Sequence, residues 1–175
     1  MKKMLVPIVV VFASLAGNMG CGSSTSPDNK PTTIVFKATL SPQNEVPPVT
    51  NADASGSGNV TITIHDITYR SSGEPNTGIV DFQVTLNGFP LLTQVTAAHI
   101  HVGGVGVAGA VVLDTGLSAA GGTTLTTGSG TITRNGIAVD GDLIDGFNLG
   151  PSSYYFNVHT QLNGTGAVRG QLVKQ

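Results

Sequence analysis

The chain has 175 residues, 24 of them glycine, and only 10% of its residues are charged. Its formal net charge is −2, and without the two lysines near the N-terminus six basic residues face ten acidic ones, a charge of −4. This weakly acidic balance excludes the basic footprint by which proteins bind nucleic acid. The length predicts one domain with enough chain to bury a hydrophobic core.

The N-terminal segment has the composition of an export signal. Two lysines precede an apolar run that ends at Ala16, and small residues follow up to Cys21. A cationic start, an apolar stretch of about 7–15 residues and a small-residue exit describe a secretory signal peptide. A membrane span needs roughly 18–20 apolar residues, and Pro7 interrupts this shorter run. We therefore predict a lipoprotein-type signal peptide over residues 1–20.

Cys21 is the only cysteine, so an intramolecular disulfide is impossible. Its position resembles the lipid-modified cysteine of bacterial lipoproteins, with Gly20 before it and a Gly-Ser-Ser-Thr-Ser-Pro stretch after it. We predict that Cys21 carries a lipid and that residues 21–33 form a flexible tether. Asn18 stands where the lipoprotein motif usually has Leu, so cleavage after Ala16, which would give a soluble exported protein, is the open alternative.

Alternation of apolar and polar residues dominates the remaining chain. It is clearest over residues 34–40, 60–64 and 80–86, where every second residue is apolar. This period predicts strands with one buried face. Further strands are expected at residues 95–102, 110–113, 128–133, 153–160 and 167–173.

Glycine- or proline-containing breaks separate these strands, at residues 56–58, 71–78, 88–90, 103–109 and 121–122. Only residues 140–149 are expected to hold a helical turn, and Gly141 and Gly146 argue against a long one. About eight short strands at regular spacing predict an all-β fold, an antiparallel Greek-key β-sandwich or barrel. We expect this single domain to span residues 34–175.

Three segments have distinctive sequences: EVPPV at residues 45–49, AHIHVG at 98–103, and YFNVHT at 155–160 followed by GAVRGQL at 166–172. In this order they resemble the CHRD (chordin) family, which shows an EVPPV-like start, an AHIH-x-G centre and a YxNVHT…GxxRGQL close. The resemblance covers roughly residues 36–172, nearly the whole predicted mature chain.

The resemblance implies an extracytoplasmic β-sandwich module. Such modules are found in chordin, the extracellular antagonist of bone morphogenetic proteins, and in many bacterial secreted proteins. It implies no particular activity, because the family has no established catalytic function. Growth-factor binding is not carried over, since no such partner is expected for a bacterial lipoprotein. Residues 103–109 depart from the family, which often has a proline where this chain has only Gly, Val and Ala.

The four histidines can be placed by strand phase. Alternate residues of a strand share a face, so His99 and His101 project together, opposite the apolar Ile100. The same phase places His159 and His65 opposite the apolar residues of their own strands. All four histidines are therefore expected to point outward.

A His-x-His pair on a strand is a competent two-ligand element for Zn, Cu or Ni. His159 supplies a third ligand if its strand lies beside that of His99, whereas His65 need not be near. The alternative interpretation is structural: the histidines bond loop backbone and one another, fixing the sheet edge. A weak similarity to the His-x-His strand of Cu/Zn superoxide dismutase predicts no enzyme, because four histidines cannot supply its two-metal ligand set.

Other catalytic patterns are missing from the sequence. It contains no Gly-x-Ser-x-Gly element, and the Gly-rich residues 103–106 lack the lysine of a phosphate loop. Arg169 is a candidate ligand-binding residue for a carboxylate or phosphate. In the alternative interpretation, Arg169 pairs with a structural carboxylate such as Glu45.

The sequence thus predicts an exported, lipid-anchored CHRD-like module with a non-enzymatic binding or structural role in the cell envelope, at the outer membrane or cell surface. Expected partners are the membrane, through the N-terminal lipid, and an envelope or extracellular protein or a glycan. The alternative function is an envelope metal-binding protein that holds Cu or Zn through His99, His101 and His159.

Overall fold

This computed structural model describes residues 29–118 and 122–175, which contain ten strands, one α-helix and three short 3₁₀ helices. The strands are β1 (Ile34–Leu40), β2 (Ser57–Tyr69), β3 (Pro75–Asn87), β4 (Thr93–Val102), β5 (Val111–Asp114), β6 (Thr123–Leu125), β7 (Gly130–Asp140), β8 (Tyr154–Thr160), β9 (Val168–Gln171) and β10 (Val173–Lys174). The helix is α1 (Gly141–Leu149), and residues 31–175 form one compact unit. The predicted signal peptide and Cys21 lie outside the described residues.

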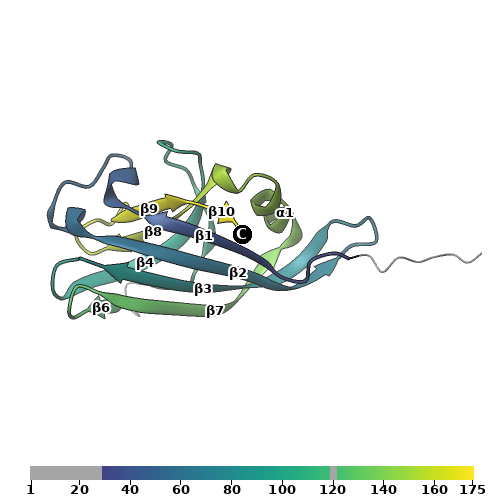
Figure 1. Ribbon diagram of the computed structural model, residues 1–175, viewed down its shortest axis with the longest axis horizontal. Helices are drawn as coiled ribbons and strands as arrows, with labels where there is room; N and C mark the ends of the chain where they lie inside the picture. Colours follow the sequence, from purple (N-terminus) through teal and green to yellow (C-terminus); the bar gives the residue numbers. More distant parts are fainter. Residues whose placement is uncertain (1–28, 119–121) are drawn as a thin grey trace, which may run out of the picture. The chain divides into compact units, whose positions relative to one another are not determined.

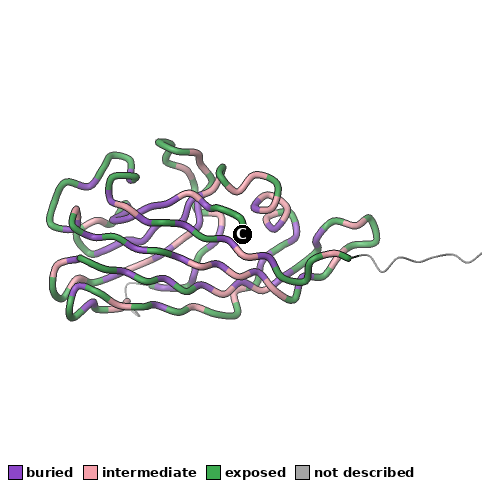
Figure 2. Tube along the Cα trace, viewed as in Figure 1, coloured by how far each residue is buried: buried purple, intermediate pink, exposed green. Residues whose placement is uncertain are grey.

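Strands β1, β2 and β3 form an antiparallel meander in which buried and exposed residues alternate, as Figure 2 shows. Phe36 of β1 lies opposite Ile62 of β2, which in turn lies opposite Phe82 of β3. All three side chains are fully buried. Since burying a side chain of this size contributes about 1.5–3 kcal/mol, these apolar rows fix the strand register.

The strands form two sheets that pack as a sandwich (Figure 1). Sheet A has the order β10-β1-β2-β3-β7, and sheet B has the order β5-β4-β8-β9, with β6 also paired to β4. The chain crosses between the sheets after β3, β6, β7 and β9. Phe82 of sheet A packs on Phe156 of sheet B, with ring centroids 5.8 Å apart. The predicted all-β sandwich is confirmed.

The two sheets join along one edge, where the end of β1 meets β9. Ser41 and Arg169 exchange two backbone hydrogen bonds of 3.0 and 3.1 Å. Gly170 lies so close to the chain of β1 that a Cβ atom there would overlap the carbonyl oxygen of Thr39. The sandwich is therefore closed at this edge, and β9 brings its side chains next to the segment that follows β1.

Helix α1 caps one end of the core. The Asp140 side chain accepts a hydrogen bond of 2.8 Å from the Leu143 backbone N–H, which is the usual way to begin a helix. Phe147 is fully buried and meets Phe36 of β1 edge-on. The glycine at 146 is required by packing, because a Cβ atom there would overlap the Tyr154 hydroxyl. Among the described residues no helix has the length and apolar character needed to cross a membrane.

Several boundaries differ from the sequence-based expectation. The expected break at residues 71–78 is shorter, because β3 already begins at Pro75. Strand β7 continues to Asp140, well beyond the expected end at 133, because it stays paired to β3. The expected strand at 167–173 is split, since β9 belongs to sheet B whereas β10 pairs with β1 in sheet A.

Candidate metal centre

Three histidines share the outer face of sheet B because β4 and β8 are antiparallel neighbours. The register places His159 opposite Ala97, which is two residues before His99 on β4. It places Tyr155 opposite His101, which is two residues after His99. Ile100 between the two histidines of β4 faces the core and is fully buried. The strand of His159 thus lies beside that of His99, as the prediction of His159 as a third ligand required.

The three imidazole rings are in mutual contact range. Ring centroids are 4.9 Å apart for His99 and His159, 5.6 Å for His99 and His101, and 6.2 Å for His101 and His159. One ring nitrogen from each residue lies within 4.8 Å of the other two. His65 belongs to β2 in the other sheet, where its two nitrogens face the carboxylates of Asp66 and Asp81.

The expectation that these histidines point outward needs correction. They do project from the face opposite the core, but His101 and His159 each have a relative exposure of only 8%. The loops that follow β4 and β8 close over this face. Gly109 in the first loop and Gly164 in the second bring backbone carbonyls onto the rings. Strand phase gives the face correctly, but it cannot show that loops cover it.

Hydrogen bonds to these loops determine the tautomers of two rings. His101 Nδ1 lies 2.9 Å from the Gly109 carbonyl oxygen, and His159 Nδ1 lies 3.0 Å from that of Gly164. A carbonyl oxygen only accepts, so both Nδ1 atoms carry the proton and, in neutral rings, both Nε2 atoms offer a lone pair. The loop bonds expected for a structural role therefore use one nitrogen of each ring and leave the other free to ligate.

His99 has one partner suited to the metal-free centre and another suited to the metal-bound centre. Its Nδ1 lies 3.0 Å from His159 Nε2, to which it donates when no ion is bound. Its Nε2 lies 3.8 Å from Asp114 Oδ1 on β5. With the proton on Nε2 instead, His99 faces Asp114 as the donor and turns the Nδ1 lone pair toward the other two rings. A carboxylate on the far nitrogen of a ligand histidine is a common arrangement in metal sites.

Burial keeps two of these rings neutral. It lowers the pKa of His99, an effect that Asp114 opposes and that His101 reinforces. It also lowers the pKa of His159, against the hydrogen bond to Gly164 and together with the neighbouring rings of His99 and His101. Only neutral imidazole ligates a metal, so these shifts favour binding.

The distances fit a single small ion after a modest contraction. Zinc–nitrogen bonds are about 2.0–2.1 Å, so a tetrahedral ion holds its ligand nitrogens roughly 3.3 Å apart. His99 Nδ1 and His159 Nε2, at 3.0 Å, already have this separation. The widest separation of 4.8 Å requires a movement of roughly 1.5 Å.

Tyr155 and Arg169 support the centre from one side. The Tyr155 ring stacks on His101 with a centroid distance of 4.8 Å and an interplanar angle of 8°. The Arg169 guanidinium carbon lies 3.4 Å from the centroid of the same Tyr155 ring. The Tyr155 hydroxyl accepts a hydrogen bond from the Gly109 N–H, on the loop that also holds His101.

Arg169, the candidate ligand-binding residue, is only 1% exposed. Its Nη2 donates to the Gly104 carbonyl oxygen at 2.7 Å and to Gln171 Oε1 at 3.2 Å. The buried carboxyl of Glu45 is close enough to respond to its charge. Burial raises the pKa of Glu45 to about 7, while Arg169 and a side-chain hydrogen bond with Asn157 act in the opposite direction.

Sequence reasoning missed Asn157 and Tyr155 as parts of this cluster. The signal was present in the YFNVHT segment, where residues 155, 157 and 159 share one face of the strand. Only His159 was singled out, because it is the residue of that face with metal-ligand chemistry.

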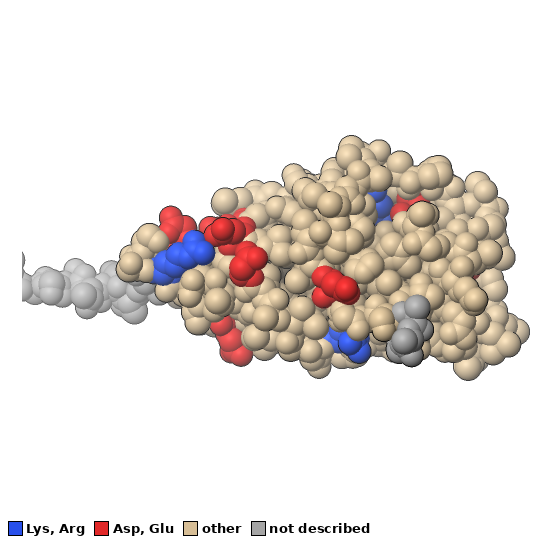
Figure 3. Space-filling model, turned by 180° about the vertical axis from the view of Figure 1, so that it is seen from behind, with Lys and Arg blue, Asp and Glu red and all other residues tan. Residues whose placement is uncertain are grey.

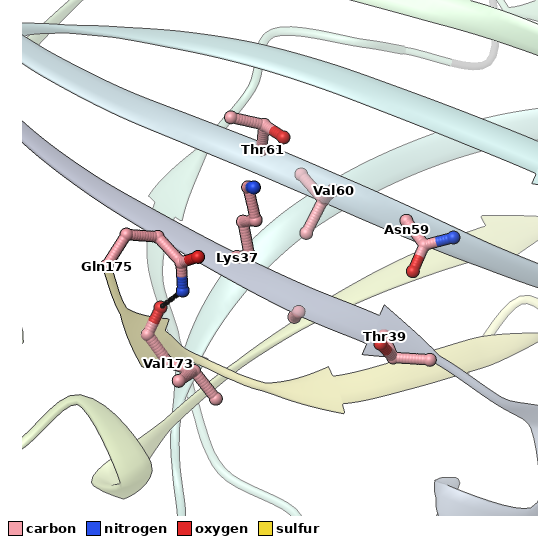
Figure 4. Close-up of a pocket in the computed structure, with 8 residues that line it drawn as sticks. Lys37, Thr39, Asn59, Val60, Thr61, Val173 and Gln175 are labelled. Atoms are coloured by element: carbon pink, nitrogen blue, oxygen red, sulfur yellow. Dashed lines mark hydrogen bonds between the residues drawn. The ribbon is translucent and has the colours of Figure 1, made fainter.

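A separate groove lies on the other sheet. It has a volume of about 490 Å³, is lined from β1, β2 and β10, and contains Lys37 as its one charged residue (Figure 4). Its other polar side chains come from Thr39, Asn59, Thr61 and Gln175. The groove offers no metal-ligand set and does not adjoin the histidines of sheet B.

Comparison with known protein families matches residues 36–172 to the CHRD domain. No curated protein and no solved structure matches the chain. The matched segment begins in β1 and ends at Leu172, so it contains the three histidines, Glu45 and Arg169. The chain therefore belongs to the CHRD domain family.

Proposed function

We propose that this chain is an exported, lipid-anchored β-sandwich module of the cell envelope that binds one Zn(II) or Cu(II) ion through His99, His101 and His159. We propose a non-enzymatic role, in which the module binds the ion. Cys21 is the proposed lipid attachment site. A single acyl chain binds membranes only marginally, so stable anchoring requires the several chains that bacterial lipoproteins carry.

The proposal rests mainly on the hydrogen bonding of the two ring nitrogens of His101. Its Nδ1 is held by the Gly109 carbonyl, whereas its Nε2 is buried and has no hydrogen-bond partner among the described residues. Leaving such an atom unpaired costs about 1–3 kcal/mol. A metal ion held with His99 and His159 removes that cost and uses the lone pair that the tautomer provides.

The ligand chemistry favours borderline transition metals. Three neutral imidazoles suit Zn(II) and Cu(II), whereas Ca(II) and Mg(II) prefer oxygen ligands. The carboxylate of Asp114, 3.8 Å from His99 Nε2, favours the tautomer with the proton on Nε2, which leaves Nδ1 free to ligate.

The test is a calorimetric titration of residues 31–175, the compact unit, with zinc and with copper. The informative variant is His101→Asn, because the asparagine amide can still donate to the Gly109 carbonyl in place of Nδ1 but offers no imidazole nitrogen. We expect one tight site in the wild type. Loss of an outer partner of a metal ligand costs about 10–100-fold, so loss of the ligand itself should weaken binding by on the order of 100-fold or more.

His65→Asn is the matched control, since His65 lies in the other sheet. It should leave the affinity unchanged. Absence of a tight site in the wild type, or equal loss in the two variants, would return the three histidines to a purely structural role.

A further inference from the structure

Asn157 occupies the middle of the polar outer face of sheet B. It lies directly opposite His99 of β4 on one side and Arg169 of β9 on the other. Opposed residues of neighbouring strands share a face, with Cβ atoms about 4.5–5.5 Å apart. The Asn157 side chain, with 2% exposure, is therefore adjacent to the histidines and shielded from solvent.

Glu45 reaches the same face from the segment after β1. Its carboxyl lies against Gly166, where a Cβ atom would come within 2.6 Å of both carboxyl oxygens. It shares a side-chain hydrogen bond with Asn157. Since Asn157 Oδ1 has no partner, the Nδ2 group must be the donor in this bond. The amide oxygen diverges from the amide nitrogen, so Oδ1 is turned away from Glu45 and stays available as an acceptor.

Three buried atoms of this cluster lack a hydrogen-bond partner within the described residues: Asn157 Oδ1, Glu45 Oε1 and His101 Nε2. Such unpaired atoms are costly and require an explanation. A metal ion satisfies the imidazole nitrogen, whereas Asn157 Oδ1 needs a hydrogen-bond donor. The O–H group of a metal-bound water is such a donor, and Asn157 lies directly opposite His99.

Resting on the proposed function, we infer that the three-histidine centre holds water as its fourth ligand, and that Asn157 Oδ1 accepts a hydrogen bond from this water. Glu45 is the positioning residue, because it holds the amide nitrogen and thereby directs the amide oxygen. Three protein ligands with an open position for water distinguish such a centre from a closed structural site with four protein ligands.

The arrangement discriminates among ligands that replace the water. A protic ligand keeps the hydrogen bond to Asn157. An anion without protons, such as azide, directs lone pairs at Oδ1 and leaves that acceptor unpaired. Azide should therefore bind weakly to the wild-type copper form. The variant Asn157→Leu removes the acceptor while keeping the side-chain size, and should raise azide affinity about tenfold, the effect of roughly one hydrogen bond.

The experiment uses Cu(II)-loaded residues 31–175 and follows azide binding by the change in the visible spectrum. The matched control is Asn59→Leu, which makes the same substitution at an exposed position on the outer face of sheet A. Its azide affinity should equal that of the wild type. Electron spin-echo measurements on the wild type in D₂O should also detect coordinated, exchangeable deuterons.

The outcomes separate this inference from the proposed function. If the wild type takes up no copper, the proposed function fails. If copper binds tightly but azide affinity is the same in Asn157→Leu and the wild type, the inference is overturned while the function stands. Should Asn157→Leu not fold, the deuteron measurement on the wild type decides alone, and absence of coordinated deuterons overturns the inference.

Discussion

The histidines His99 and His159 on the one hand, and the carboxyl group of Glu45 on the other, give opposite dependences of folding stability on pH. The pKa values of His99 and His159 are lowered, so below about pH 6.5 the unfolded chain takes up protons first and the metal-free fold loses stability. Glu45 behaves in reverse. Its pKa is raised to about 7, so the folded state holds a proton that the unfolded state releases near its ordinary value of 4.5. That contribution is complete below 4.5 and is lost as pH rises through 7.

The variant Glu45→Gln tests this assignment. Glutamine stays neutral, so the variant should lack the loss of stability that ionisation of the buried carboxyl causes. Each pKa unit corresponds to about 1.4 kcal/mol, and with partial solvation we expect the free energy of unfolding to shift by roughly 2 kcal/mol in favour of the variant between about pH 5 and about pH 8. Urea unfolding at several pH values measures the shift. Parallel curves for the two proteins would show that Glu45 is not the group that titrates.

At the scale of elements, the junction of β1 and β9 decides whether the sandwich closes. A Cβ atom at Gly170 would overlap the Thr39 carbonyl, so Gly170→Ala must push the two strands apart. We expect a loss of about 2–3 kcal/mol of unfolding free energy, in the range of overpacking substitutions. Hydrogen exchange should also accelerate at the amides of Ser41 and Arg169, which bond each other's carbonyls across the junction.

Gly164→Ala is the matched control for this prediction. Gly164 lies in the loop after β8, and a Cβ atom there meets nothing within 4 Å. Its stability should remain within about 0.5 kcal/mol of the wild type. Equal losses at the two glycines would mean that the close approach at Gly170 does not set the stability of the junction.

The burial pattern of strands with one solvent-exposed face was predictable from the sequence. The burial pattern of strands that are covered on both faces was only partly predictable. β1 to β3 alternate in burial as their sequences do. In β8, however, six consecutive residues from Tyr155 are buried, because loops cover the face that carries His159. The folding of the apolar 103–109 loop onto the rings depends on contacts such as Gly104 with Arg169, which are distant in sequence. Strand β6, with only three residues, carries too short a pattern to predict.

At the scale of the whole molecule, the proposed attachment to a membrane rests on Cys21, which lies outside the described part of the chain. We predict that Cys21→Ser leaves the protein unprocessed or releases it from the membrane fraction, because serine offers no thiol for the lipid. Fractionation of cells that express the full chain measures this, with Ser23→Ala as the control beside it. A Cys21→Ser protein that is processed and fractionates like the wild type would contradict the lipoprotein assignment.

The strands of sheet B carry almost no charge, which has a consequence for how this face meets other molecules. Across β4, β5, β6, β8 and β9 the charged residues are Asp114 and the buried Arg169. In Figure 3, the surface seen from behind is mostly uncharged, and acidic and basic side chains gather toward one end. Long-range steering needs charge, and salt weakens it over a Debye length of about 8–10 Å. Encounters at this face should therefore proceed at nearly the same rate at low and at high ionic strength.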